Sequence, residues 1–287
     1  MADLAYSEGD WASADGLTLR YRDYPGAGSR PPILCIPGLT RNARDFEPLA
    51  QAFAGEWRVI CPDLRGRGQS DYAKDPASYT PVSYVADVAA LLDQAGIDRV
   101  VVIGTSLGGI IAMLLAVQAP ERIAAAVLND IGPAIEPAGI ARIREYVGQG
   151  RSFPTWMHAA RALRDQAGAA HPDFAIADWL RLAKRWMVVG GGGRIVFDYD
   201  MKIAEPFQQA DTTEPADMWP AFRALAGRPV LAIRGELSDI LSASTLSRMK
   251  REMPGMETLV VPRTGHAPTL EEPSAQAAIA RLLAQVA

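Results

Sequence analysis

A serine between closely spaced glycines is the feature of this sequence best suited to chemistry. Ser106 lies at the centre of Gly104-Thr105-Ser106-Leu107-Gly108, a Gly-x-Ser-x-Gly pattern. The β-branched run before it predicts a buried parallel strand, and the Ala/Leu-rich run after it predicts a helix. A sharp bend between strand and helix presents a hydroxyl at a helix N-terminus, where negative charge is favoured. We predict Ser106 as a nucleophile; the alternative is an incidental serine in a glycine-rich turn.

A serine hydroxyl needs a base within hydrogen-bonding reach, and the chain has three histidines. His266 follows the apolar run 258–261, which predicts the last strand of the sheet, so it is expected at the same edge as Ser106. His158 lies in a helical pattern, and we interpret it as a core or pocket-lining residue. His171 precedes a proline in a polar turn, and we interpret it as a solvated loop residue. We predict His266 as the base.

Two aspartates follow predicted strands and could orient the histidine. Asp239 follows the run 230–234 and precedes His266, which gives the chain order Ser, Asp, His known from one class of such triads. Asp130 ends the strand predicted at 123–130. We predict Asp239 as the orienting acid, with Asp130 as the second candidate; otherwise Asp130 is a strand-end carboxylate.

An oxyanion formed on attack by Ser106 would need two converging N–H donors. One is the backbone N–H of Leu107, next to the serine. The other is expected from the loop Pro37-Gly38-Leu39, which follows the apolar run 33–36. We predict the N–H of Leu39 as the second donor.

The elements that must position these groups alternate between strands and helices. The pattern predicts an α/β fold with a doubly wound, mostly parallel sheet of eight strands and helices on both faces. An antiparallel hairpin opens the sheet. The predicted strands lie at 8–12, 17–24, 33–36, 57–61, 100–103, 123–130, 230–234 and 258–261.

The stretch 134–222 interrupts this alternation. It has helical patterns at 138–148, 155–165 and 173–189, no clear strand alternation, and a run of four glycines at 190–193. It is too long and too apolar for a loop. We therefore predict a core domain from 1–133 and 223–287, with 134–222 inserted as a helical cap.

The predicted cap carries aromatic and sulfur-containing side chains that could line an apolar pocket. We assign substrate contacts to Trp156, Trp186, Met187 and Phe207, with packing inside the cap as the alternative. Arg41 and Asn42 follow the predicted oxyanion loop. They would meet a polar end of the substrate or belong to a solvated approach to the next helix.

Composition narrows the classes of function. The 287 residues are 49% hydrophobic and 22% charged, and the net charge of −4 argues against a nucleic-acid partner. No apolar run is long enough to span a bilayer, and the N-terminus does not resemble a signal peptide, so we expect a cytoplasmic protein without a membrane partner. Cys35 and Cys61 lie in predicted strands without further ligands at metal spacing, so we expect core residues and no metal site. The oligomeric state stays open between monomer and homodimer.

Taken together, these motifs carry a family resemblance. The elbow 104–109, the pairs Ser238-Asp239 and Gly265-His266, Pro37-Gly38, and the loop Asp63-Leu64-Arg65-Gly66-Arg67-Gly68-Gln69-Ser70 resemble those of the α/β-hydrolase superfamily, in its capped serine-esterase type. The resemblance implies a cofactor-independent carboxylic ester hydrolase acting on a small ester or lactone that is apolar or aromatic.

Two other functions remain possible on this scaffold. One is a lactonase or a C–C bond hydrolase of an aromatic degradation pathway, although Thr105 stands where the C–C hydrolases tend to have Asn. The other is a non-catalytic hydrolase-like ligand-binding protein. Ser106 itself differs from the Asp that haloalkane dehalogenases and epoxide hydrolases place there, and Pro37 replaces the His of many relatives.

Overall fold

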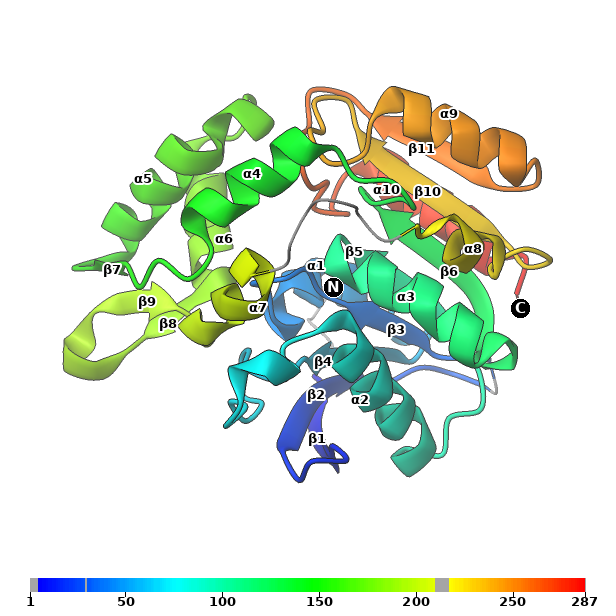
Figure 1. Ribbon diagram of the computed structural model, residues 1–287, viewed down its shortest axis with the longest axis horizontal. Coiled ribbons are helices and arrows are strands. Elements are labelled where there is room, and N and C mark those ends of the chain that lie inside the picture. Colours follow the sequence, from blue (N-terminus) through cyan, green and yellow to red (C-terminus); the bar gives the residue numbers. More distant parts are fainter. Residues whose placement is uncertain (1–4, 29, 210–216, 287) are drawn as a thin grey trace.

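The computed structural model describes residues 5–28, 30–209 and 217–286. An eight-stranded sheet forms its centre, in the order β1-β2-β4-β3-β5-β6-β10-β11 (Figure 1). β2 pairs antiparallel with β1 and β4, and the remaining pairs are parallel. This confirms the predicted fold. The strands are β1 Ser7–Ala12, β2 Thr18–Tyr24, β3 Ile33–Ile36, β4 Val59–Asp63, β5 Val100–Thr105, β6 Ile123–Asn129, β10 Val230–Gly235 and β11 Glu257–Val261.

The central strands are buried on both faces because helices cover each side of the sheet. On β5, Val100 and Val102 pack into one apolar cluster, while Val101 and Ile103 pack into the other. This alternation follows from the two-residue period of a strand. The cluster of Val101 includes residues of α1 (Glu47–Phe53) and α10 (Pro273–Leu283). That of Val100 includes residues of α2 (Pro81–Gln94), α3 (Leu107–Gln118), α8 (Trp219–Arg223) and α9 (Ala243–Glu252).

The inserted region forms a separate lobe, on the left in Figure 1. Its helices are α4 Pro137–Tyr146, α5 Trp156–Ala167, α6 Ile176–Trp186 and α7 Ala204–Gln209. Residues of α5 and α6 form an apolar cluster of their own around Trp179, whereas Ile143 of α4 and Ala204 of α7 pack in the cluster of Val100.

A small antiparallel sheet also lies in this lobe, so the expectation of a region without strands is wrong. Its order is β7-β9-β8, with β7 Ser152–Phe153, β8 Met187–Val189 and β9 Ile195–Phe197. The glycine run 190–193 is the hairpin turn between β8 and β9, and the N–H of Gly190 donates to the carbonyl of Arg194 at 2.8 Å. Strands of two or three residues are too short to show an alternating pattern.

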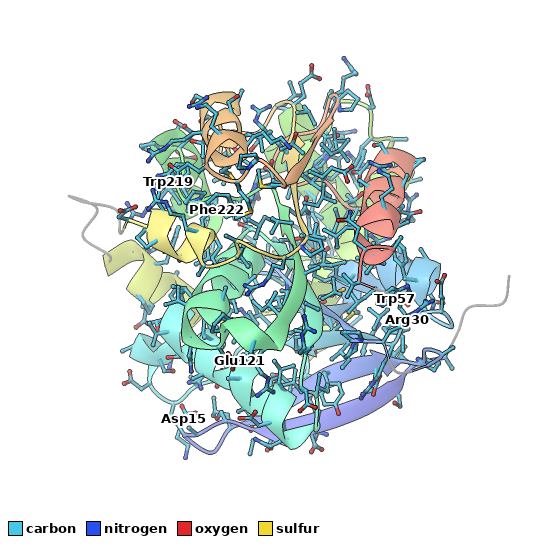
Figure 2. The ribbon with its side chains drawn as sticks, turned by 90° about the vertical axis from the view of Figure 1, so that its right-hand side faces the viewer. Asp15, Arg30, Trp57, Glu121, Trp219 and Phe222 are labelled. Atoms are coloured by element: carbon cyan, nitrogen blue, oxygen red, sulfur yellow. The ribbon has the colours of Figure 1, made fainter. Side chains whose placement is uncertain are left out.

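Packing against the core resumes before residue 222, where we expected the insertion to end. Trp219 and Phe222 of α8 make an edge-to-face ring contact and pack in the same cluster as α3 (Figure 2). Residues 210–216, within the expected cap, lie outside the described residues.

Two further sequence expectations concern the interior and the membrane. Cys35 in β3 and Cys61 in β4 are fully buried and form no disulfide, which confirms them as core residues. Within the described ranges, no helix combines the length and apolar character needed to cross a membrane.

Candidate active site

The turn between β5 and α3 holds Ser106 in a strained backbone conformation. Its φ is 52° and its ψ is −114°, a region that residues with a Cβ rarely adopt. The N–H of Ser106 donates to the carbonyl of Asn129 at the end of β6, at 3.0 Å. Ser106 directly precedes the first turn of α3, so its hydroxyl lies at the positive end of the helix dipole.

Glycines allow this turn to close. A Cβ on Gly104 would lie 2.3 Å from the backbone of Gly108, and a Cβ on Gly108 would lie 2.0 Å from the carbonyl oxygen of Ile36. These backbone atoms belong to buried elements and have little freedom to move. The Gly-x-Ser-x-Gly pattern is therefore a packing requirement of the bend.

This requirement predicts a loss of stability for Gly108→Ala. We expect the free energy of unfolding to fall by about 3 kcal/mol, because the new methyl group must displace β3 or α3. Gly255→Ala is the matched control, since no atom lies within 4 Å of that Cβ position; it should change stability by about 0.5 kcal/mol or less. Urea unfolding of both variants measures the difference. Equal free energies of unfolding for the two variants would show that the close approach of Gly108 to the Ile36 carbonyl is unimportant.

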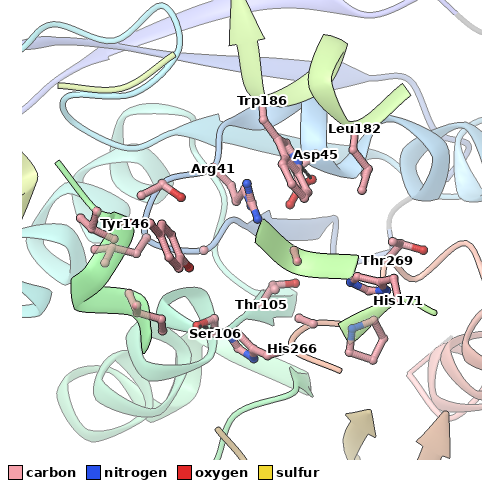
Figure 3. Close-up of a pocket in the computed structure, with 18 of the residues that line it drawn as sticks. Arg41, Asp45, Thr105, Ser106, Tyr146, His171, Leu182, Trp186, His266 and Thr269 are labelled. Carbon is pink, nitrogen blue, oxygen red and sulfur yellow. Dashed lines mark hydrogen bonds between the residues drawn. The ribbon is translucent and has the colours of Figure 1, made fainter. Parts of the chain in front are cut away.

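His266 reaches Ser106 from the loop after β11. Its Nε2 lies 3.0 Å from the Oγ of Ser106, and its Nδ1 lies 2.8 Å from the Oδ2 of Asp130. Figure 3 shows the two side chains of Ser106 and His266 next to each other on the floor of a pocket. The structure thus brings together the serine and the histidine that the sequence singled out.

The carboxylate that contacts His266 belongs to Asp130, the second of our two candidates. Asp130 directly follows β6, has a φ of 55° and is fully buried. Its Oδ1 accepts a hydrogen bond from the N–H of Gly235 at 2.8 Å, and its Oδ2 accepts one from the hydroxyl of Ser238 at 2.6 Å. These bonds hold the carboxylate in a single orientation toward the imidazole.

The expected pairing of Asp239 with His266 is wrong. Asp239 instead forms an ion pair with Arg142 of α4, through contacts of 2.5 and 2.9 Å. Burial raises the pKa of Asp239, but the hydrogen bonds and charge of Arg142 outweigh it, and the net pKa is lowered. Because β6 and β10 are neighbours, the loops after both reach the same edge of the sheet. The loop after β10 supplies the Ser238 hydroxyl that donates to Asp130, and Asp130 itself directly follows β6.

The two predicted oxyanion donors belong to segments that adjoin Ser106. Leu107 is the first residue of α3, so its N–H has no acceptor within the helix. Gly38 adjoins the serine: a Cβ on it would lie 3.7 Å from the Cβ of Ser106. Its carbonyl accepts a hydrogen bond from the N–H of Arg41 at 3.1 Å, which closes a turn around Leu39.

Arg67 holds this turn, a contribution that sequence reasoning missed. Its Nε and Nη2 donate to the carbonyl of Leu39 at 2.9 and 2.8 Å, and its Nη1 donates to the hydroxyl of Tyr84 at 2.9 Å. Arg67 is fully buried. The motif loop 63–70, which we used only as a sign of family, therefore fixes the segment beside the serine.

A pocket lies between Ser106 and the inserted helices (Figure 3). Of the predicted substrate contacts, Arg41 and Trp186 line it. Trp156, Met187 and Phe207 do not. The lining residues from the inserted region are Ile143, Tyr146, Val147, Ala167, His171, Leu182 and Trp186; the others are Gly38, Leu39, Thr40, Arg41, Asp45, Phe46, Thr105, Ser106, His266, Ala267, Pro268 and Thr269.

The three side chains that miss the pocket pack elsewhere. Trp156 and Met187 belong to the apolar cluster of the inserted lobe. Phe207 packs against the larger core, with the guanidinium of Arg144 at 5.5 Å from its ring. The paired helices α5 and α6 need an apolar interior, and aromatic residues at helical spacing provide part of it.

His171 lines the pocket and is buried, so its interpretation as a solvated loop residue is wrong. Its ring stacks on Phe174 at 4.5 Å and meets Trp179 edge-on at 5.9 Å. Burial, followed by the charge of Arg41, lowers the pKa of His171 to about 4. His158, by contrast, is exposed and contacts Thr155 at 2.9 Å, so it is not a core residue, and it does not line the pocket at Ser106.

The lowered pKa of His171 predicts an acid-sensitive fold. The unfolded chain binds a proton at this residue below about pH 6.5, whereas the folded chain does so only near pH 4. Stability is therefore lost as the pH falls through this window. We expect wild type to lose about 2 kcal/mol more than His171→Phe between pH 7 and pH 5, measured by urea unfolding. Equal losses in both proteins would show that His171 does not contribute.

Among the residues that the structure describes, no group of three or more His, Cys, Asp or Glu side chains is placed to hold a metal ion.

Comparison with known proteins identifies the family. The model of the alpha/beta hydrolase fold family matches residues 31–273. The chain belongs to this family. The chain is similar to an alpha/beta hydrolase from Novosphingobium aromaticivorans whose crystal structure is known. The two sequences are 61% identical, the match covers all of both chains, and the two structures superimpose with a TM-score of 0.95.

Two curated proteins that are similar to this chain are named for their substrates. A 3-hydroxybutyrate-oligomer hydrolase of Cupriavidus necator is 34% identical over 269 residues, which cover 91% of each chain. A 2-(acetamidomethylene)succinate hydrolase of Mesorhizobium japonicum is 28% identical over 253 residues, which cover 87% of this chain and 85% of that hydrolase.

Proposed function

We propose that this alpha/beta hydrolase cleaves carboxylic esters through an acyl-enzyme, with Ser106 as nucleophile, His266 as base and Asp130 as the orienting acid. One observation carries the proposal. The chain of contacts from Ser106 Oγ to His266 Nε2 at 3.0 Å, and from His266 Nδ1 to Asp130 Oδ2 at 2.8 Å, is the arrangement that activates a serine hydroxyl.

The reaction follows from these positions. His266 Nε2 takes the proton of Ser106 as Oγ attacks the ester carbonyl, and the N–H groups of Leu39 and Leu107 stabilise the resulting oxyanion. The protonated histidine then donates its proton to the departing alcohol oxygen. A water molecule repeats the sequence on the acyl-enzyme and releases the acid. Asp130 accepts the Nδ1–H bond throughout and stabilises the imidazolium.

The lobe from about residue 134 is the proposed cap that selects the substrate. Its α4 and α6 supply Tyr146, Leu182 and Trp186 to the pocket wall opposite the serine. A lid of this kind excludes water from the reacting carbonyl and shapes the space for the acyl and alcohol groups.

Ester hydrolysis is preferred over the alternatives on the basis of the relatives. The 3-hydroxybutyrate-oligomer hydrolase is the more similar of the two curated relatives, and its name points to hydroxy-acid oligomers. A lactonase or C–C bond hydrolase would use the same triad. A non-catalytic ligand-binding protein would not require a serine held in contact with a histidine that is paired with a buried aspartate.

A substrate panel tests the proposal. Purified protein is assayed with p-nitrophenyl esters of graded acyl length, with lactones, and with a vinylogous diketone acid that requires C–C cleavage. We expect turnover of short esters. Turnover of the diketone acid without ester hydrolysis would replace the proposal by the C–C alternative, and no turnover of any substrate would favour a binding protein.

A further inference from the structure

Arg41 extends into the pocket from the turn beside the nucleophile. A Cβ on Gly38 would lie 3.6 Å from the Cγ of Arg41 and 3.7 Å from the Cβ of Ser106, so both side chains lie next to the same glycine. Figure 3 shows the guanidinium of Arg41 pointing into the middle of the pocket, between Tyr146 and Trp186. Any substrate with its carbonyl at Ser106 would pass close to this group.

The guanidinium of Arg41 has a ring contact but no anionic partner among the described residues. Its Cζ lies 3.1 Å from the ring centroid of Trp186. Two nearby arginines, by contrast, have hydrogen-bond acceptors: Arg44 pairs with Asp198 at 2.8 Å, and Arg67 donates to the Leu39 carbonyl. Stacking on a ring face leaves the N–H donors at the edge of the guanidinium unused.

The carboxylate of Asp45 does not fill this role. It also lines the pocket, but its Oδ1 accepts the indole N–H of Trp186 at 2.6 Å and forms no ion pair with Arg41. Burial lowers the pKa of Arg41, while Asp45, Tyr146 and Tyr199 raise it and Arg142 lowers it. Arginine stays charged under all these influences. A partly enclosed cation without a partner is costly, and an anion in the pocket would offset that cost.

The charges that line the pocket favour a singly charged anion, a carboxylate, as the partner of Arg41. The pocket lining contains one arginine and one aspartate, and His171 is neutral near pH 7 because its pKa is about 4. A phosphate dianion would face Asp45 with a single cation to bind it. A carboxylate carries one charge and fits the planar guanidinium through two parallel hydrogen bonds.

We propose that Arg41 binds a free carboxylate of the substrate, so that the preferred substrates are small esters carrying a carboxylate a few bonds from the scissile carbonyl. The inference rests on the proposed ester hydrolysis and specifies its substrate class. Arg41 thereby sets specificity, with no part in the proton transfers at Ser106.

Two matched substrate pairs test the role of Arg41. The first is 3-acetoxybutanoate against 3-acetoxybutanamide, which places the carboxylate on the alcohol side. The second is monoethyl succinate against ethyl succinamate, which places it on the acyl side. Each pair exchanges a charged carboxylate for a neutral carboxamide of nearly the same size. We expect wild type to favour the carboxylate of at least one pair by about 30-fold in kcat/KM, as a charge-assisted hydrogen bond provides.

Substitutions at Arg41 assign the preference to this side chain. Arg41→Met keeps the apolar stem and should bring the ratio of carboxylate to carboxamide close to one. Arg41→Lys should restore a large part of the ratio. Arg161→Met, an exposed residue of α5, makes the same change in net charge and should leave the ratio at its wild-type value.

The outcomes separate this inference from the proposed function. If wild type hydrolyses both members of each pair equally well, or if its preference survives Arg41→Met, Arg41 is not a carboxylate site while ester hydrolysis stands. If neither the charged nor the neutral esters are hydrolysed, the proposed function fails first, and the inference with it.

Discussion

Ser106→Ala is expected to lower kcat/KM for ester hydrolysis by about 10⁴-fold or more, because the oxyanion donors and the pocket retain only the small part of catalysis that needs no nucleophile. The fold should persist, since the new side chain is smaller and keeps its Cβ. Ser247→Ala is the matched control. Ser247 is an exposed residue of α9 whose hydroxyl bonds its own helix, and its loss should leave turnover unchanged.

Steady-state kinetics of the two serine variants, with circular dichroism to verify folding, measure the effect. A folded Ser106→Ala protein with more than about a tenth of wild-type turnover would remove Ser106 from the reaction.

The second large effect is expected at Asp130. Asp130→Asn should reduce kcat by about 10³- to 10⁴-fold, because an amide cannot hold the required tautomer of His266 or stabilise the imidazolium. Asp239→Asn weakens the partly exposed ion pair with Arg142 and should change kcat by less than about tenfold. The same kinetic assay compares them. A damaging Asp239→Asn and a nearly silent Asp130→Asn would reverse the assignment of the acid.

The sheet and the turn that holds Ser106 could be predicted because each depends on local sequence. Continuous apolar runs indicate strands that are buried on both faces. Gly104 and Gly108, on either side of Ser106 in the sequence, indicate a bend too tight for a Cβ at those two positions. The position of His266 follows from topology, since parallel strands end at one edge. These inferences needed no knowledge of side-chain orientation.

The choice between Asp130 and Asp239 depends on orientation, which the sequence does not encode locally. Both residues follow neighbouring strands, β6 and β10. What separates them is the positive φ of Asp130, the hydrogen bond from Ser238, and the presence of Arg142 near Asp239. Arg142 lies nearly a hundred positions away in the chain, so its pairing emerges only from the tertiary structure.

The pocket wall was the least predictable part for a similar reason. Trp156 and Trp186 belong to successive helices with comparable patterns, yet only Trp186 lines the pocket. His171 looks like a loop residue in sequence, but Phe174 and Trp179 cover its ring. The way the lobe packs on the core decides which face of an inserted helix lines the pocket. Helical periodicity identifies an apolar face but not its partner.

Covalent labelling of the serine tests the central claim most directly. The protein is treated with a fluorophosphonate, which an activated serine attacks at phosphorus with loss of fluoride, and intact mass and peptide mapping locate the adduct. The account predicts one adduct per chain on the peptide containing Ser106, slow labelling in Asp130→Asn, and none in Ser106→Ala. An unlabelled wild-type protein, or an adduct that persists in Ser106→Ala, would contradict it.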